Sequence, residues 1–255
     1  MRSAPLIALD SPDPEAVDGR QIRAAAFQDV RLAYTFAVLE DLGRAASGRA
    51  LVMGGGRGLL ARGLARLGFE VTAVDPSRAA TAMARTAAER AGLAIEHRTA
   101  LAEDPGLPAA AFDLVYLADT LEITSDPDRV IERAAHTLKP DGVLVYDTVN
   151  RTVLSRLVYL VAFQRLPMTR VVPAGRYAAR RLRKPAEVAA LVARHGLRQA
   201  ETCHFKPRSA RSLISAVLGR RRGRMTDDEI ASLAGFQLAP GTSPLVTYLG
   251  HARKV

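Results

Sequence analysis

Residues 51–60 read Leu-Val-Met-Gly-Gly-Gly-Arg-Gly-Leu-Leu, and this stretch decides the fold. A short apolar strand at Ala50–Met53 runs into the glycines, and a helix at Leu59–Leu67 follows them. Glycines here let the backbone turn sharply and approach a ligand closely, and the helix N-terminus adds unpaired N–H groups. The next strand, Glu70–Val74, is followed by Asp75, whose carboxylate can accept hydrogen bonds from a ribose diol. The two features together predict a nucleoside-containing cofactor, and a tight turn without a ligand is the alternative.

The spacing of the glycines indicates which cofactor to expect. Dinucleotide-binding enzymes usually carry Gly-x-Gly-x-x-Gly, but the position of the third glycine is occupied here by Leu59. The glycines instead stand at Gly54, Gly55, Gly56 and Gly58. Glycine at alternate positions is typical of methyltransferases that use S-adenosyl-L-methionine. We therefore expect that cofactor, with S-adenosyl-L-homocysteine as its product.

Strand-like and helix-like segments alternate around this turn. A helical pattern at 22–42 is followed by strands at 50–53, 70–74, 94–98, 112–117 and 143–149, and by helices at 59–67, 78–91 and 128–138. The alternation predicts parallel βαβ units with helices on both faces of an open sheet. A strand at 245–252 comes after a long excursion, and such a strand often lies antiparallel. The expected fold is α/β and Rossmann-like, with a mostly parallel seven-stranded sheet, an antiparallel last strand and helices on both faces.

The boundaries of the expected domain follow from composition. Residues 1–22 are rich in proline and aspartate, which favours a flexible N-terminus. No linker divides the remainder, so 23–255 is expected to be a single domain with insertions at about 151–183 and 206–243. A helix at 185–195 and a strand at 197–205 lie between these insertions.

Composition excludes several classes of protein. The chain has 255 residues, a net charge of +10 and a hydrophobic content of 48%, which excludes a mainly disordered protein. Its single cysteine, Cys203, excludes a scaffold of intrachain disulfides and favours the cytoplasm. The longest apolar run, 157–163, is far shorter than the roughly 20 residues of a membrane-spanning helix. Arginine clusters at 176–184 and 220–224 fit either a phosphate-bearing partner or a solvated face.

The segment 154–172 combines apolar residues with Arg156, Arg165 and Arg170. This pattern predicts an amphipathic helix with basic flanks. Such a helix could cover the pocket of an apolar small-molecule acceptor. It could also lie at an anionic lipid surface, which would hold a cytoplasmic protein peripherally at the inner membrane.

Short motifs outside the glycine turn match one known family. They are Arg31-Leu32-Ala33-Tyr34, Phe112-Asp113-Leu114-Val115, Asp126-Pro127, Leu138-Lys139-Pro140-Asp141-Gly142, Thr148-Val149-Asn150-Arg151, Lys184-Pro185-Ala186-Glu187, His204-Phe205-Lys206-Pro207 and Val246-Thr247-Tyr248. From about residue 28 onward the chain resembles the class I methyltransferases, most closely the ubiquinone-biosynthesis O-methyltransferase family. Besides the glycines and Asp75, the resemblance implies cofactor contacts at Arg31, Pro76, Thr99, Ala100, Leu101 and Ala118.

The chain also departs from that family's pattern. Val52 stands where the family has an acid beside the methionine part of the cofactor, and Thr99 replaces an acid near the adenine. Ala118 replaces a methionine. The family's Glu-x-x-Glu-His run, linked to magnesium, reads Asp119-Thr120-Leu121-Glu122-Ile123 here. Because Ile123 cannot coordinate a cation, we expect no metal site.

Methyl transfer requires an acceptor that is held in line and relieved of its proton. His204 and Tyr177 are candidates to remove that proton or to orient the acceptor, and Asp147 is a third because it ends a strand facing the crevice. Each also has a structural interpretation: a core histidine, a packing tyrosine and a turn cap.

The expected activity is methyl transfer to a hydroxyl of an apolar aromatic or polyketide-like small molecule, with oxygen preferred over nitrogen or carbon. Two alternatives stay open. The substitutions at Val52, Thr99 and Ile123 would suit a relative that is non-catalytic or catalyses a different reaction. The arginine clusters would suit an RNA methyltransferase, but charge alone gives no specificity, and we do not expect a nucleic-acid partner.

Overall fold

The strands form one mixed sheet, in a computed structural model that describes residues 5–255. They are β1 (Gly48–Met53), β2 (Phe69–Asp75), β3 (Ile95–Thr99), β4 (Phe112–Leu117), β5 (Leu138–Val149), β6 (Leu197–Gln199), β7 (Cys203–Pro207), β8 (Phe236–Ala239) and β9 (Thr247–Lys254). Their order is β3-β2-β1-β4-β5-β9-β7-β8, and β6 also pairs with β9. Strands β1 to β5 are parallel and β9 runs antiparallel to β5. The predicted α/β class is confirmed.

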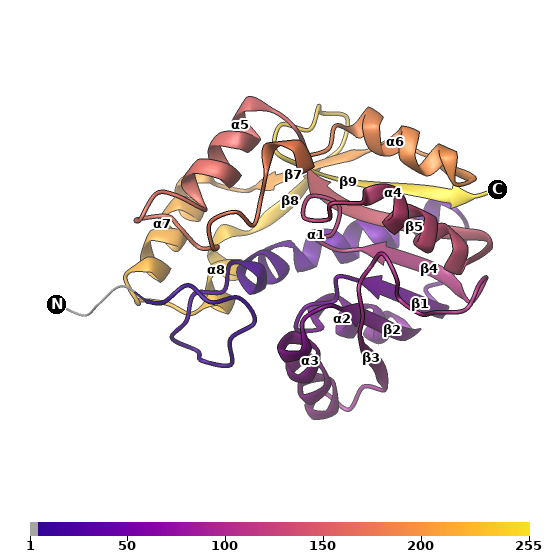
Figure 1. Ribbon diagram of the computed structural model, residues 1–255, viewed down its shortest axis with the longest axis horizontal. Helices are drawn as coiled ribbons and strands as arrows, with labels where there is room; N and C mark the ends of the chain where they lie inside the picture. The colour runs from indigo at the N-terminus through magenta and orange to yellow at the C-terminus, as the bar shows by residue number, and fades with distance from the viewer. Residues whose placement is uncertain (1–4) are drawn as a thin grey trace.

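Helices cover both faces of this sheet (Figure 1). They are α1 (Gly19–Asp41), α2 (Leu59–Leu67), α3 (Arg78–Arg90), α4 (Pro127–Thr137), α5 (Val153–Ser155), α6 (Pro185–Arg194), α7 (Ala210–Arg221) and α8 (Asp227–Ala234), with a π-helix, η1 (Arg156–Ala162), and a 3₁₀ turn, η2 (Ala179–Arg181). The inward residues of β1, β2 and β4 pack on α1 and α2, whereas alternate residues of the same strands pack on α4 and α6. This two-sided burial explains why the strands are continuous apolar runs.

The sheet has nine strands in the described residues rather than the expected seven. The segment expected as one strand at 197–205 is interrupted at 200–202, so that β6 pairs with one end of β9 and β7 pairs with the other. The second expected insertion contributes β8, which pairs with β7. Pairing of β7 with β9 and β8 satisfies backbone groups that a seven-stranded sheet would leave at an edge.

The N-terminal segment makes contacts with the rest of the chain. Residues 1–4 of the expected flexible stretch lie outside the described residues. Within 5–18, Val17 is fully buried and Ile7 pairs with it. The buried Arg220 of α7 donates hydrogen bonds to carbonyls at 14–16 and pairs with Asp227 at 2.6 Å. The segment is thereby attached to α7 and α8, which lie beside it away from the C-terminus (Figure 1).

The first insertion forms a third apolar cluster at the carboxyl end of β5. Tyr159, Tyr177 and Val172 pack there with Val149 and with residues of α7 and α8. The expected amphipathic helix is realised only as α5 and the π-helix η1, after which the chain turns. No helix in residues 5–255 is both long enough and apolar enough to cross a membrane.

Candidate active site

The glycine turn lies at the carboxyl ends of β1, β2 and β4. The N–H groups of Gly54 and Gly55 both donate to the carbonyl oxygen of Val74, at 3.0 Å. Gly54 has a φ of +82°, and a Cβ there would clash with the carbonyl oxygen of Ala118. Gly58 has a φ of +76° and begins α2. Only glycine fits the close approach at position 54, so the turn has the local geometry expected from the sequence.

Asp75 ends β2 directly beside this turn. Its carboxylate accepts hydrogen bonds from the N–H of Gly56 at 2.8 Å and from the N–H of Ser77 at 2.9 Å, and only 3% of the residue is exposed. The glycine turn and the acid are therefore brought together as the sequence predicted. The donors and acceptors present fit an adenosyl cofactor: a carboxylate for the ribose diol, and a glycine backbone against which the ligand can lie.

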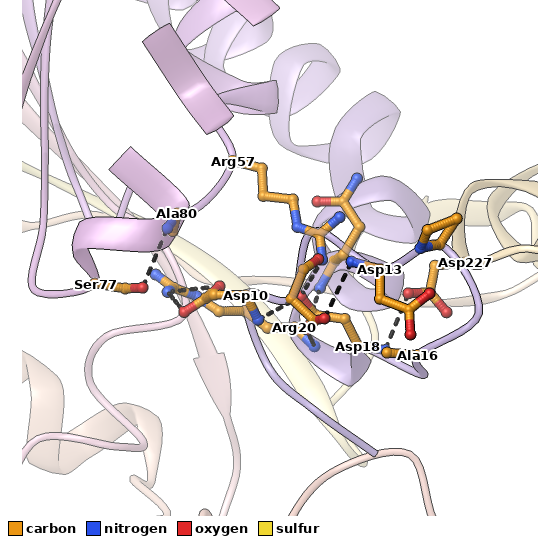
Figure 2. Close-up of polar contacts among 12 residues, drawn as sticks. Asp10, Asp13, Ala16, Asp18, Arg20, Arg57, Ser77, Ala80 and Asp227 are labelled. Carbon is orange, nitrogen blue, oxygen red and sulfur yellow. Dashed lines mark hydrogen bonds and ion pairs between the residues drawn. The ribbon is translucent and has the colours of Figure 1, made fainter. Parts of the chain in front are cut away.

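The crevice between these groups is occupied by a side chain of the protein itself. The guanidinium of Arg20, at the start of α1, spans both oxygens of Asp75, with Nη1 3.1 Å from Oδ1. Asp10 pairs with the same arginine at 3.2 Å, and Arg57 of the glycine turn pairs with Asp18 at 2.7 Å (Figure 2). The remaining cavity is about 20 Å³, which is room for about one water molecule. The residues fit the cofactor, but Arg20 must leave Asp75 before a ribose can reach it.

A buried cluster of charges lies next to the crevice. Arg31 of α1 pairs with Asp119 at 2.7 Å and with Asp147 at 2.9 Å. Arg23, two turns earlier on α1, pairs with Asp119, with Glu122 at 2.5 Å and with Asp147 at 3.4 Å. We call these five residues the arginine–carboxylate cluster. Arg31 and Asp119 also line the crevice, so the cluster connects the cofactor side of the site with the third apolar cluster.

The carboxyls of the cluster differ in proton affinity. Burial raises the pKa of Asp119, but the guanidiniums of Arg23 and Arg31 lower it further, and the result is a pKa well below the usual range. Burial raises the pKa of Glu122 to about 7, with Arg23 opposing the rise and Asp119 adding to it. Burial likewise raises the pKa of Asp147, which Arg31 opposes. Within one cluster the surroundings thus lower the pKa of Asp119 and raise the pKa values of Glu122 and Asp147.

The structure places the three proposed catalytic residues in different environments. Asp147 belongs to the arginine–carboxylate cluster. Tyr177 packs edge-on against Tyr159, with ring centroids 5.0 Å apart, and Tyr159 in turn lies against the guanidinium of Arg23. His204 is not brought to either residue. Its ring hydrogen-bonds Thr242, and burial lowers its pKa.

The register of the sheet explains the position of His204. Asp147 of β5 and Cys203 of β7 are both opposite Leu249 of β9, whereas His204 is opposite the next residue, Tyr248. Neighbouring residues of a strand point to opposite faces, so His204 lies on the face that packs against α4 and α6, and Asp147 on the face that packs against α1. His204 and Asp147 therefore lie on opposite faces of the sheet.

The positions that the resemblance implies for the cofactor fall into two groups, those that line the crevice and those that do not. Arg31 and Ala118 line the crevice together with Gly54, Gly55 and Gly56. Pro76, Thr99 and Leu101 are exposed at the rim, and Ala100 donates its N–H to the carbonyl oxygen of Asp75 at 3.0 Å. Val52 is fully buried in the apolar core beneath α1. The valine at this position thus contributes to packing and not to a polar contact.

Arg20 and Arg23 were not identified from the sequence as residues of the site. A signal was present: Arg20, Arg23, Phe27 and Arg31 share one face of α1, and long basic side chains on an otherwise apolar helical face require buried partners. The spacing by itself does not show which carboxylates those partners are.

Comparisons with known proteins agree with this geometry. A family model described as a methyltransferase domain matches residues 51–146. The ubiquinone biosynthesis O-methyltransferase of Xanthomonas axonopodis pv. citri is 35% identical over 181 residues, covering 71% of this chain and 73% of that protein. Among solved structures, YcgJ from Bacillus subtilis superposes with a TM-score of 0.60 at 17% identity, covering 89% of this chain and 98% of its own. Magnesium protoporphyrin IX methyltransferase from Synechocystis was solved with bound S-adenosylhomocysteine. It superposes with a TM-score of 0.59 at 16% identity, covering 92% of this chain and 86% of its own.

Proposed function

The chain belongs to the S-adenosylmethionine-dependent methyltransferases, in the family of the ubiquinone biosynthesis O-methyltransferases, and we propose that it methylates a hydroxyl oxygen of an apolar aromatic or polyketide-like small molecule. The relatives' name supports oxygen as the acceptor atom. The third apolar cluster, which meets the arginine–carboxylate cluster at Tyr159, supports an apolar acceptor. The observation that carries the proposal is the meeting of the glycine turn and Asp75 at adjacent strand ends.

The chain's own residues supply binding and orientation. S-adenosylmethionine, when bound, supplies the electrophilic methyl group. Asp75 would hold its ribose diol, and the backbone of the glycine turn would lie against it. The apolar side chains around Tyr159 and Tyr177 exclude water, which favours the displacement by keeping competing nucleophiles away.

We propose Asp147 as the group that handles the proton of the acceptor. Its Oδ2 pairs with Arg31, while its Oδ1 is buried and has no hydrogen-bond partner among the described residues. Burial raises the pKa of this carboxyl, and a raised pKa brings a general base closer to the operating pH. We propose that Oδ1 accepts the hydroxyl proton and that Tyr177 orients the acceptor ring.

The experiment that tests this function combines binding with turnover. Calorimetric titration with S-adenosylmethionine should show binding well below millimolar, and radiolabelled methyl should be transferred to the oxygen of an alkyl-substituted catechol. Asp147→Asn should reduce kcat by roughly 100-fold or more, the size of a general-base contribution, with an unchanged Kd for the cofactor. Asp113→Asn, at a half-exposed ion pair with Lys139, is the matched control. Absence of cofactor binding, or label found on carbon or nitrogen, would contradict the proposal.

A relative that binds the cofactor without transferring methyl is the second candidate. One observation favours it: Arg20 fills the crevice and leaves about 20 Å³. The same titration separates the candidates, because this protein would bind S-adenosylmethionine and leave every hydroxylated probe unmethylated. RNA as the acceptor gains little support from the structure, since Arg220 of the second arginine cluster is buried and paired with Asp227.

We also propose that the segment 154–172, with Val153 before it, touches an anionic membrane surface, which would place the protein at the cytoplasmic face of the inner membrane. Its exposed apolar side chains are Val153, Leu154, Leu157, Leu166 and Met168, and Arg156, Arg165 and Arg170 are exposed beside them. Apolar insertion flanked by cations suits anionic lipid. Vesicles of phosphatidylglycerol should therefore sediment the protein and vesicles of phosphatidylcholine should not. Leu157→Ser should weaken sedimentation, and Leu233→Ser, exposed on α8, should not; equal binding to both lipids would contradict this.

A further inference from the structure

Arg23 occupies the centre of the buried carboxylates. Its side chain is 6% exposed, and those of Glu122 and Asp147 are fully buried. Nη2 lies 2.5 Å from Glu122 and 3.4 Å from Asp147, while Nε pairs with Asp119. One guanidinium therefore contacts all three acids, whereas Arg31 contacts only two of them.

The surroundings of Arg23 hold its guanidinium in place. Its carbon Cζ lies 5.1 Å from the ring centroid of Phe27 and 5.3 Å from that of Tyr159. These are cation–π distances. Burial lowers the pKa of Arg23, but Asp119 and Glu122 raise it by more, so the group remains a cation. A planar guanidinium with five N–H donors can serve several carboxylates at once.

The cluster does not have the geometry of a metal site. The resemblance to the ubiquinone-biosynthesis family implies magnesium at the run ending in Ile123, but Ile123 packs against the third apolar cluster. Among the described residues no three His, Cys, Asp or Glu side chains are placed to hold an ion. The acids of this run instead point at two guanidiniums. A divalent cation would have to displace Arg23 from these carboxylates. The guanidinium of Arg23 would then remain buried without the acids that pair with it.

We propose that the guanidinium of Arg23 is the resident cation of this cluster and stands in for the divalent metal ion that the resemblance implies. Three buried carboxylates near the crevice need a positive charge to stay ionised. In this chain that charge comes from α1 and is covalently part of the protein. Cofactor binding and methyl transfer therefore require no added divalent cation, and Arg23 is a positioning residue that fixes the orientation of Asp119 and Asp147.

Thermal unfolding with and without MgCl₂ tests the proposal, and it needs neither acceptor nor turnover. The wild-type midpoint should be the same in EDTA and in millimolar MgCl₂. Arg23→Gln, which removes the charge, should lower the midpoint in EDTA, and MgCl₂ should raise it again by roughly 3–6 °C, as expected for an ion at about ten times its dissociation constant. Arg23→Lys, which keeps the charge, should remain insensitive to the metal.

The outcomes separate a resident cation from a purely structural arginine. A structural role would destabilise Arg23→Gln and Arg23→Lys without any response to MgCl₂, and that result would overturn the proposal. A wild-type midpoint that rises with MgCl₂ and falls with EDTA would overturn it as well. If Arg23→Gln does not fold in EDTA, refolding in millimolar MgCl₂ is the second measurement: recovery of a cooperative thermal transition supports the proposal, and no recovery overturns it. Failure of methyl transfer would leave each of these readings unchanged.

Discussion

Replacement of Arg20 by alanine should tighten the binding of S-adenosylmethionine. If Asp75 holds the ribose of the cofactor as proposed, Arg20 competes with the ribose for this carboxylate. The side chain of Asp75 is 4% exposed and that of Arg20 is 11% exposed. A charge-assisted hydrogen bond contributes about 1.5–3 kcal/mol net, and the wild type must break this contact before binding. Each 1.4 kcal/mol is a factor of ten, so we expect the Kd of Arg20→Ala to fall by roughly 10- to 100-fold. Asp75 should keep its orientation, because the N–H groups of Gly56 and Ser77 still hold it.

Isothermal titration calorimetry with S-adenosylmethionine and with S-adenosylhomocysteine is the assay. Arg49→Ala is the control, because Arg49 forms a surface ion pair with Glu70 at 3.6 Å, away from the crevice. The Kd of this control should equal that of the wild type. An Arg20→Ala variant that binds the cofactor with unchanged or weaker affinity would refute the reasoning, since Arg20 would then be a cofactor ligand and not a competitor.

Three further expectations concern stability. Gly54→Ala should cost about 2–4 kcal/mol of unfolding free energy and abolish cofactor binding, because the new Cβ meets the Ala118 carbonyl. Gly92→Ala, at a positive φ in open space, should cost only about 1 kcal/mol by urea unfolding. Burial lowers the pKa of His97 to about 4, so the unfolded chain binds this proton first as pH falls from about 6.5 to 4, and stability is lost over that range. In His97→Gln the loss of unfolding free energy over the same pH range, measured by urea unfolding, should be smaller by about 1–2 kcal/mol, and an unchanged loss would count against this. Arg220→Met should leave Asp227 buried without the arginine that pairs with it, and the free energy of unfolding should fall by about 3–5 kcal/mol. It should also expose residues 5–18 to limited proteolysis. A cleavage pattern like that of the wild type would show that other contacts hold this segment.

The sequence was sufficient to predict an element where its residue preferences and its pattern of buried residues indicate the same structure. The helix at Leu59–Leu67 and the strand at Phe112–Leu117 have the predicted bounds. The adjacency of Gly56 and Asp75 was also predictable, because parallel neighbours in a βαβ unit end at the same edge of the sheet. The expected strand at 197–205 was wrong in detail, since pairing with two ends of β9 divides it and no local residue preference encodes that partner.

The candidate site was only partly predictable. Asp147 was expected at the crevice because it ends a strand, and it lies in the arginine–carboxylate cluster. His204 was a candidate to remove the acceptor's proton, with a core histidine as the alternative interpretation, and the alternation of strand residues places it on the other face of the sheet from Asp147. That assignment depends on how β7 pairs with β9 after an excursion of about 40 residues, and a one-residue change of register would reverse it.

By itself the sequence determined the order of the strands and helices up to residue 149, the glycine turn, and the carboxylate at the end of the next strand, since each of these shows in its own local pattern of residues. Only the tertiary structure decided which charges meet. Arg20 reaches Asp75 across 55 residues, and Arg31 reaches Asp147 across 116. Such partners are fixed by the packing of α1 on the sheet, because a buried charge must find whatever opposite charge the fold brings within reach.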